Sequence, residues 1–228
     1  MANAAPDNDS PDVTERVAEM AAEVAQDTAG TAKKGKPALS RRLRLAKLAR
    51  THALVFLGAL SAFAAADSWS ALSGLGIAGF LSVITGALAG VTIATLIHEW
   101  FHYLGARQSG ARFDIPSRQG LFLYDWDFGS NSLRQFLTMS VAGTIGGFMA
   151  VFLLWTSVPA DTWGRAALRG GAIAGVVFAA YIEWPVIRRT RRGADPLAEL
   201  SKIDQSLLSR SLVVASVAGI MAMLVFAP

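Results

Sequence analysis

Long apolar runs alternate with short polar segments along most of the chain, and their lengths predict helices that span a membrane. The runs occupy five stretches: 51–70, 75–105, 136–158, 170–187 and 211–227. About 20 apolar residues in a helix, within a range of roughly 17 to 25, cross the hydrocarbon core of a bilayer. The pattern therefore predicts an all-α membrane protein with a bundle of about five transmembrane helices, and residues 51–228 form its membrane-embedded domain.

The stretch between the second and third runs has a different pattern. From Leu121 to Phe128, apolar and polar residues alternate with the period of a strand. This alternation predicts one or two short strands at the membrane surface, in a small interfacial loop. The alternative is an irregular loop whose Tyr124 and Trp126 rest at the level of the lipid headgroups.

Composition narrows the class of protein further. Hydrophobic residues make up 53% of the chain and charged residues only 17%, with a mean hydropathy of +0.40, which excludes an ordinary soluble domain. The chain contains no cysteine, so disulfides, thiolate metal sites and cysteine nucleophiles are excluded. Any metal would have to be held by histidine and carboxylate side chains.

Charge is distributed unevenly and indicates the orientation. Residues 1–30 carry seven acids and one base, and residues 33–50 carry eight bases and no acid, so 1–50 is predicted to be a disordered, acidic then basic, cytoplasmic tail. The position of this basic segment beside the first span already explains its charge, so nucleic-acid binding is not needed to account for it. Bases favour the cytoplasmic side, and five alternating spans place only Arg165 and Arg169 outside. We expect an integral protein of a bacterial inner (cytoplasmic) membrane with its N-terminus in the cytoplasm.

The main chemical signal lies near the end of the second run. His98 and His102 are four residues apart, so a helix presents both on one face, and Glu99 lies about 100° around the same helix. This is the zinc-hydrolase pattern H-E-x-x-H, although two core histidines at this spacing can also arise by chance. The 30 residues before His98 contain no charge, and ionisable groups at such depth usually mark a functional site.

A catalytic zinc ion needs a third protein ligand and an open position. His52, at the start of the first span, is better explained as an interfacial residue. Glu183 lies in the otherwise uncharged fourth run, and its five-residue distance from Arg188 matches the distance of His102 from Arg107, which predicts similar depth. Asp195 is the other candidate, although Asp followed by Pro is also an ordinary helix N-cap.

The chain resembles the site-2 protease family of intramembrane zinc metalloproteases. The residues that carry the resemblance are 98–107 (HEWFHYLGAR), 134–137 (RQFL) and 140–143 (SVAG), within a region of about 75–200. In that family an aspartate ligand follows a helix that is broken at a proline, and Pro185 followed by Asp195 meets that order here. The resemblance therefore implies Zn²⁺ bound by His98, His102 and Asp195, with Glu183 as the alternative on grounds of depth.

The resemblance also implies an activity, which is hydrolysis of a peptide bond in or near the transmembrane helix of a substrate protein. Glu99 would act as the catalytic base, and residues 121–128 would offer an edge for a substrate strand. A di-iron lipid desaturase is excluded, because such sites resemble clusters of about eight histidines and this chain has three. A non-catalytic membrane protein, either an inactive relative or a transporter, stays open as an alternative. The expected partners are a transmembrane substrate and the lipid bilayer, with no nucleic acid.

Overall fold

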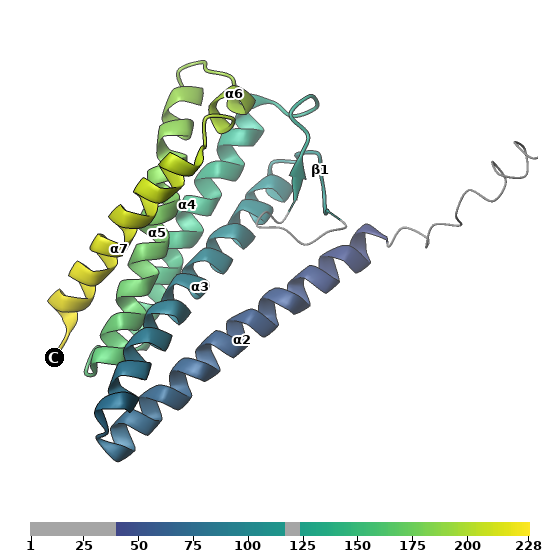
Figure 1. The fold of residues 1–228 in the computed structure, drawn as a ribbon. Coiled ribbons are helices and arrows are strands. Elements are labelled where there is room, and N and C mark those ends of the chain that lie inside the picture. Colours follow the sequence, from purple (N-terminus) through teal and green to yellow (C-terminus); the bar gives the residue numbers. More distant parts are fainter. Residues whose placement is uncertain (1–39, 117–123) are drawn as a thin grey trace, which may run out of the picture. The chain divides into compact units, whose positions relative to one another are not determined.

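The elements follow one another as long helices interrupted by one small sheet (Figure 1). The structure, a computed structural model, describes residues 40–116 and 124–228, and these belong almost entirely to one unit, Arg41–Pro228. Its elements are α2 (Arg41–Ser73), α3 (Gly76–Gln108), β1 (Phe113–Asp114), β2 (Asp125–Trp126), α4 (Leu133–Ser157), α5 (Trp163–Thr190), α6 (Pro196–Leu200) and α7 (Gln205–Phe226).

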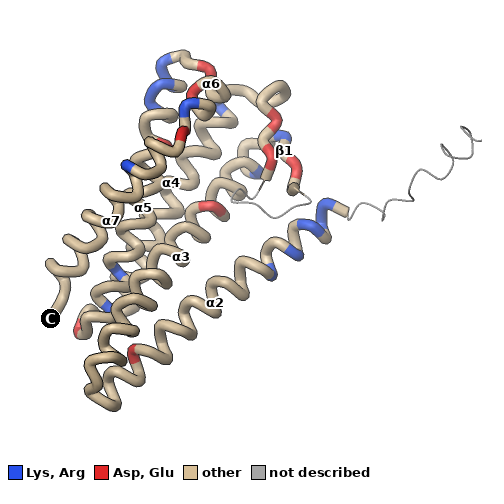
Figure 2. The backbone as a smooth tube through the Cα atoms, viewed as in Figure 1, with Lys and Arg blue, Asp and Glu red and all other residues tan. Residues whose placement is uncertain are grey.

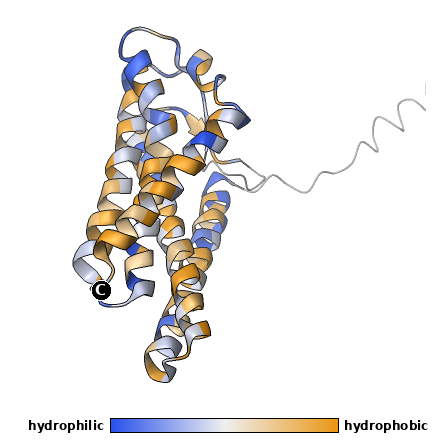
Figure 3. Ribbon diagram, turned by 60° about the vertical axis from the view of Figure 1, so that its left-hand side comes forward, coloured by the Kyte–Doolittle hydropathy of each residue, from blue (hydrophilic) through white to orange (hydrophobic). Residues whose placement is uncertain are grey.

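Five of these helices, α2, α3, α4, α5 and α7, are long and apolar enough to cross a membrane. Figure 3 shows hydrophobic colours along the helices and hydrophilic colours mainly at their ends and in the loops. The prediction of an all-α membrane protein with about five transmembrane helices and a small β element is confirmed. Five such helices indicate an integral membrane protein.

The first helix begins earlier than the sequence predicted. Residues 41–50, which we assigned to a disordered tail, form the first turns of α2. This segment holds no Gly or Pro and consists mostly of Arg, Lys, Leu and Ala, which are good helix formers. Leu48 is also buried against Tyr103 and Ile115. The rest of the predicted tail, residues 1–39, lies outside the described residues.

Close contact between α3 and α5 forms the centre of the bundle. A Cβ added at Gly90 would lie 2.0 Å from the carbonyl oxygen of Leu168, and one added at Gly171 would lie 2.1 Å from that of Ala87. Only glycine allows two helix backbones to approach so closely. Around this contact lie the buried residues of the main core: Phe63, Ala89, Ile93, Ala94, Ala150, Leu154, Leu168 and Ala172.

A polar cluster joins α2 to the start of α5, at the end of the bundle near the α2–α3 turn. The carboxylate of Asp67, which is only 7% exposed, accepts hydrogen bonds from Ser82 Oγ at 3.1 Å, Thr162 Oγ1 at 3.0 Å and Arg165 Nε at 2.9 Å. Arg165 also pairs with Asp161. Because these groups satisfy one another, this buried carboxylate has a structural role and does not indicate a second site.

The small sheet covers the other end of α3. β1 and β2 pair antiparallel, with Phe113 opposite Trp126 and Asp114 opposite Asp125. The predicted strand is thus present at residues 125–126, whereas 121–123 lie outside the described residues. Edge-on or tilted ring contacts link Tyr103, Phe113, Tyr124 and Trp126 in turn to Phe136 of α4, so an aromatic layer fixes the sheet on the helices.

Candidate metal centre

Three side chains from two helices converge inside the bundle. His98 and His102 lie one turn apart on the same face of α3, and Glu183 reaches them from α5. Oε1 of Glu183 is 2.9 Å from Nε2 of His98 and 3.1 Å from Nε2 of His102, and the two Nε2 atoms are 2.9 Å apart. Both histidines are buried, and the three residues form a group that could hold a metal ion.

A backbone carbonyl fixes the protonation of His102. Nδ1 of this ring lies 2.9 Å from the carbonyl oxygen of Met139 on α4. Since a carbonyl oxygen only accepts hydrogen bonds, Nδ1 carries a proton, so the ring in its neutral form presents a lone pair at Nε2. In metal-binding histidines, the ring nitrogen that does not face the metal typically donates its hydrogen to such an acceptor, which orients the ring.

The donor atoms of the centre fit a cation. With His102 neutral, as a metal ligand must be, the lone pair of its Nε2 faces both His98 Nε2 and the Glu183 carboxylate, and His98 can supply at most one proton from Nε2 to this set. At least one contact then brings two lone pairs together, which a cation relieves. In addition, Oε2 of Glu183 is buried and has no hydrogen-bond partner among the described residues. Two nitrogens and a carboxylate are a donor set of catalytic zinc sites.

Glycines of α4 make room for the motif of α3. A Cβ added at Gly143 would lie 2.1 Å from Cε1 of His102, and one added at Gly146 would lie 2.5 Å from Cβ of Phe101. Gly143 therefore leaves space for the His102 ring.

Substitution of Gly143 by alanine should therefore displace the His102 ring. Overpacking of this kind costs about 1–3 kcal/mol, and disturbing the support of a ligand lowers metal affinity by about 10- to 100-fold. Titration of the purified variant with metal measures the change. Gly58→Ala is the matched control, because nothing lies within 4 Å of its added Cβ; it should bind metal as the wild type does. Wild-type metal affinity in Gly143→Ala would show that the His102 ring is not confined.

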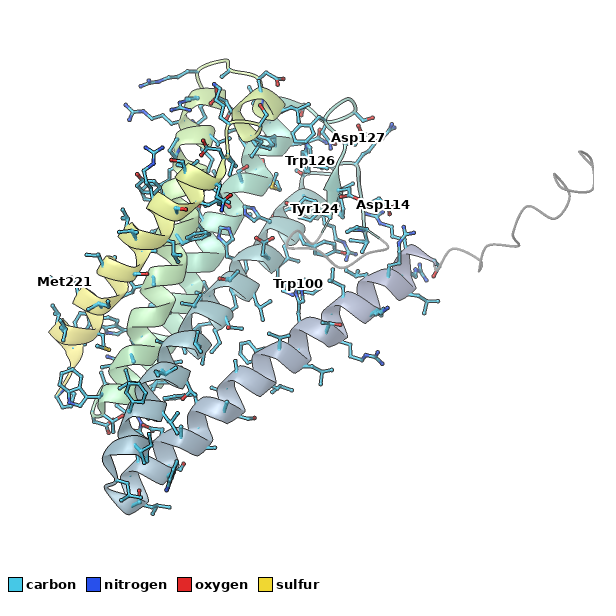
Figure 4. The ribbon with its side chains drawn as sticks, in the orientation of Figure 1. Trp100, Asp114, Tyr124, Trp126, Asp127 and Met221 are labelled. Atoms are coloured by element: carbon cyan, nitrogen blue, oxygen red, sulfur yellow. The ribbon has the colours of Figure 1, made fainter. Side chains whose placement is uncertain are left out.

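Glu99 and Tyr124 lie beside the three converging residues. The Glu99 carboxylate lies close enough to His102, His98 and Glu183 to interact with them electrostatically. Burial raises the pKa of the Tyr124 phenol above its usual range, and the negative charges of Glu99 and Glu183 add to the effect. Tyr124 directly precedes β2, and Figure 4 labels it next to α3. The small sheet therefore adjoins the centre.

The other sequence candidates lie elsewhere. Asp195 is the N-cap of α6, where its side chain accepts a hydrogen bond from the backbone nitrogen of Ala198 at 2.8 Å. The expected helix break at Pro185 does not occur, since α5 continues through it to Thr190; a proline within a membrane helix is tolerated when neighbouring groups satisfy the freed carbonyl. His52 packs edge-on against Trp100, with ring centroids 6.1 Å apart.

The fold and the centre together define an integral membrane protein in which two buried histidines and one partly buried glutamate form a group that could hold a metal ion. Comparison of the chain with protein-family models, with curated proteins and with solved structures gives no match. The function has to be argued from the centre itself.

Proposed function

We propose that this protein is a zinc-dependent intramembrane endopeptidase, with His98, His102 and Glu183 as the zinc ligands and Glu99 as the catalytic base. The observation that carries the proposal is the convergence of the three donor atoms within 3.1 Å of one another, beside a fourth side chain able to move a proton. The resemblance of residues 98–107 to the site-2 protease motif supports the same reaction.

The proposed reaction is hydrolysis of a peptide bond. Zinc, when bound, supplies Lewis acidity that makes water a better nucleophile near neutral pH. The Glu99 carboxylate takes a proton from the attacking water as the water oxygen bonds to the carbonyl carbon. As the carbon–nitrogen bond breaks, Glu99 returns this proton to the amine. Met139 holds the His102 ring through Nδ1 and keeps its Nε2 directed at the centre.

A substrate helix must unwind before its carbonyl groups can be attacked, because its backbone is internally hydrogen bonded. The adjoining sheet supports a route for this step. Tyr124 lies close to Glu99 and Glu183 and leads directly into β2, so an extended substrate segment beside β2 would approach the centre. Strand addition of this kind is a common mode of peptide recognition.

Removal of the metal tests the proposal on the wild-type protein. Purified protein in lipid is incubated with single-span substrate helices, before and after treatment with a zinc chelator. We expect cleavage products from the untreated protein, loss of cleavage after chelation, and recovery when zinc is restored. Cleavage that persists in protein shown to be free of metal would contradict the proposed chemistry.

The distribution of charge supports an orientation with the N-terminus in the cytoplasm of a bacterium. The chain has no native cysteine, so single cysteines can be placed at exposed sites at the two ends of the bundle. We expect Pro159→Cys, between α4 and α5, to react with an impermeant maleimide on intact spheroplasts, and Gln108→Cys, at the end of α3, to react only after lysis. The opposite pattern of labelling would reverse the orientation.

A further inference from the structure

A second site is suggested by a hollow between α4 and α5, outside the three converging residues. Its volume is about 470 Å³, which lies within the usual range of about 300–1,000 Å³ for small-molecule sites. Its lining comes from two helices and the turn after α5: Val141, Thr144, Trp184, Ile187, Arg188, Arg191 and Arg192. The hollow therefore has arginines at one end and apolar and hydroxyl side chains at the other.

The arginines of this hollow lack acidic partners. No Asp or Glu lines it, and Arg188, Arg191 and Arg192 form no ion pair with a carboxylate within residues 40–116 and 124–228. Figure 2 shows Lys and Arg gathered at this end of the bundle, near α6. Three unbalanced guanidinium groups form a strong site for an anion, because each can donate paired hydrogen bonds to phosphate oxygens.

A neighbouring hollow shows that this imbalance is local. The space between α5, α6 and α7 is lined by the bases Arg189, Lys202 and Arg210 together with the acids Glu199 and Asp204. Glu199 pairs there with Arg189 at 3.0 Å and with Lys202. Two of the three bases on this side of α5 are thus paired with a carboxylate, whereas none of the three arginines on the other side has such a partner among the described residues. A general excess of positive charge on this membrane side would not produce that difference.

The rest of the lining indicates what kind of anion binds. Trp184 is 49% exposed and Val141 is 42% exposed, so an apolar wall continues from the arginines along the lipid-facing surface of the bundle. Tryptophan is enriched at the level of the lipid headgroups. A free phosphate would use the arginines alone, whereas a phospholipid would also cover the apolar wall.

We propose that the hollow between α4 and α5 binds one anionic phospholipid, with the phosphate between Arg188, Arg191 and Arg192 and an acyl chain along Val141 and Trp184. Basic pockets between membrane helices are known sites for such headgroups. The proposal is independent of the metal centre, because none of these residues belongs to it. The lipid would fill the space between two helices that position the centre.

Quenching of Trp184 fluorescence by brominated lipid tests the proposal on the full-length protein in vesicles. The signal of Trp184 is the difference between wild type and Trp184→Phe. With 5% brominated phosphatidylglycerol in phosphatidylcholine, we expect several-fold more quenching of Trp184 than with 5% brominated phosphatidylcholine. In Arg188→Gln/Arg191→Gln/Arg192→Gln this preference should disappear. The triple variant Arg42→Gln/Arg107→Gln/Arg134→Gln removes as many charges outside the hollow and should keep the preference.

Three results would overturn the proposal. Equal quenching by the two headgroups would show that the hollow does not select an anion. Equal loss of preference in both triple variants would show that general surface charge attracts the lipid. Reversal of the quenching by millimolar inorganic phosphate would show that the arginines bind free phosphate, so that the lipid is not the natural occupant.

Discussion

Replacing Glu183 by alanine is expected to abolish metal binding, whereas replacing Asp195 by alanine should leave the metal in place. Glu183 directs Oε1 at both imidazoles, at 2.9 and 3.1 Å, so its loss leaves two ligands of three and should lower metal affinity by more than the roughly 100-fold typical of a supporting partner. Asp195 caps α6 through Ala198, and its loss should cost about 1 kcal/mol of helix stability.

Metal content per folded protein, measured after purification in lipid, gives the comparison directly. His98→Ala and His102→Ala should match Glu183→Ala, because each removes one donor of the same group. Asp195→Ala is the control, because it removes a carboxylate from the segment after α5 and leaves the group of three residues intact. If Glu183→Ala retained the metal and Asp195→Ala lost it, Asp195 would be the third ligand, as the resemblance to the site-2 protease family implies.

Substitution of Glu99 by glutamine should remove most of the proposed peptidase activity and leave metal binding unchanged. Glutamine keeps the size of the side chain but accepts no proton, and a positioned general base contributes about 10²- to 10⁴-fold to a reaction rate. We therefore expect the rate of cleavage under saturating enzyme to fall by that factor. Metal content should be unchanged, because Glu99 is not one of the three converging residues that could hold a metal ion.

A matched acid-to-amide change tests whether the effect is local. Asp161→Asn alters a side chain that is 60% exposed and pairs with Arg165 at the far end of α5, so it should keep both zinc and activity. If Glu99→Gln cleaves as fast as wild type, Glu99 is not the base. If wild type and variant both bind zinc and neither cleaves any membrane helix offered, a non-catalytic, metal-binding protein becomes the better explanation.

The candidate metal centre was predictable from the sequence only in part. The pair His98 and His102 was predictable because four residues bring two side chains to one helix face in any α-helix. His102 lies five residues before Arg107, and Glu183 lies five residues before Arg188. This equal separation correctly indicated that Glu183 lies at the depth of His102. The order of the resembling family pointed instead to Asp195, on the assumption that the helix breaks at Pro185. In the structure α5 runs through Pro185 and places Asp195 at the start of α6.

The sequence by itself determined the membrane class, the five apolar helices and the His98–His102 pair, because each depends only on local composition and on the period of the helix. The tertiary structure alone decided which carboxylate meets the pair, since Glu183 and His102 are 81 residues apart and meet only where α3 and α5 pack. It also decided that Gly143 leaves space for the His102 ring and that Met139 fixes its proton. Contacts of this kind depend on which helix faces meet, and the repeat of apolar and polar residues within one helix does not specify its partner.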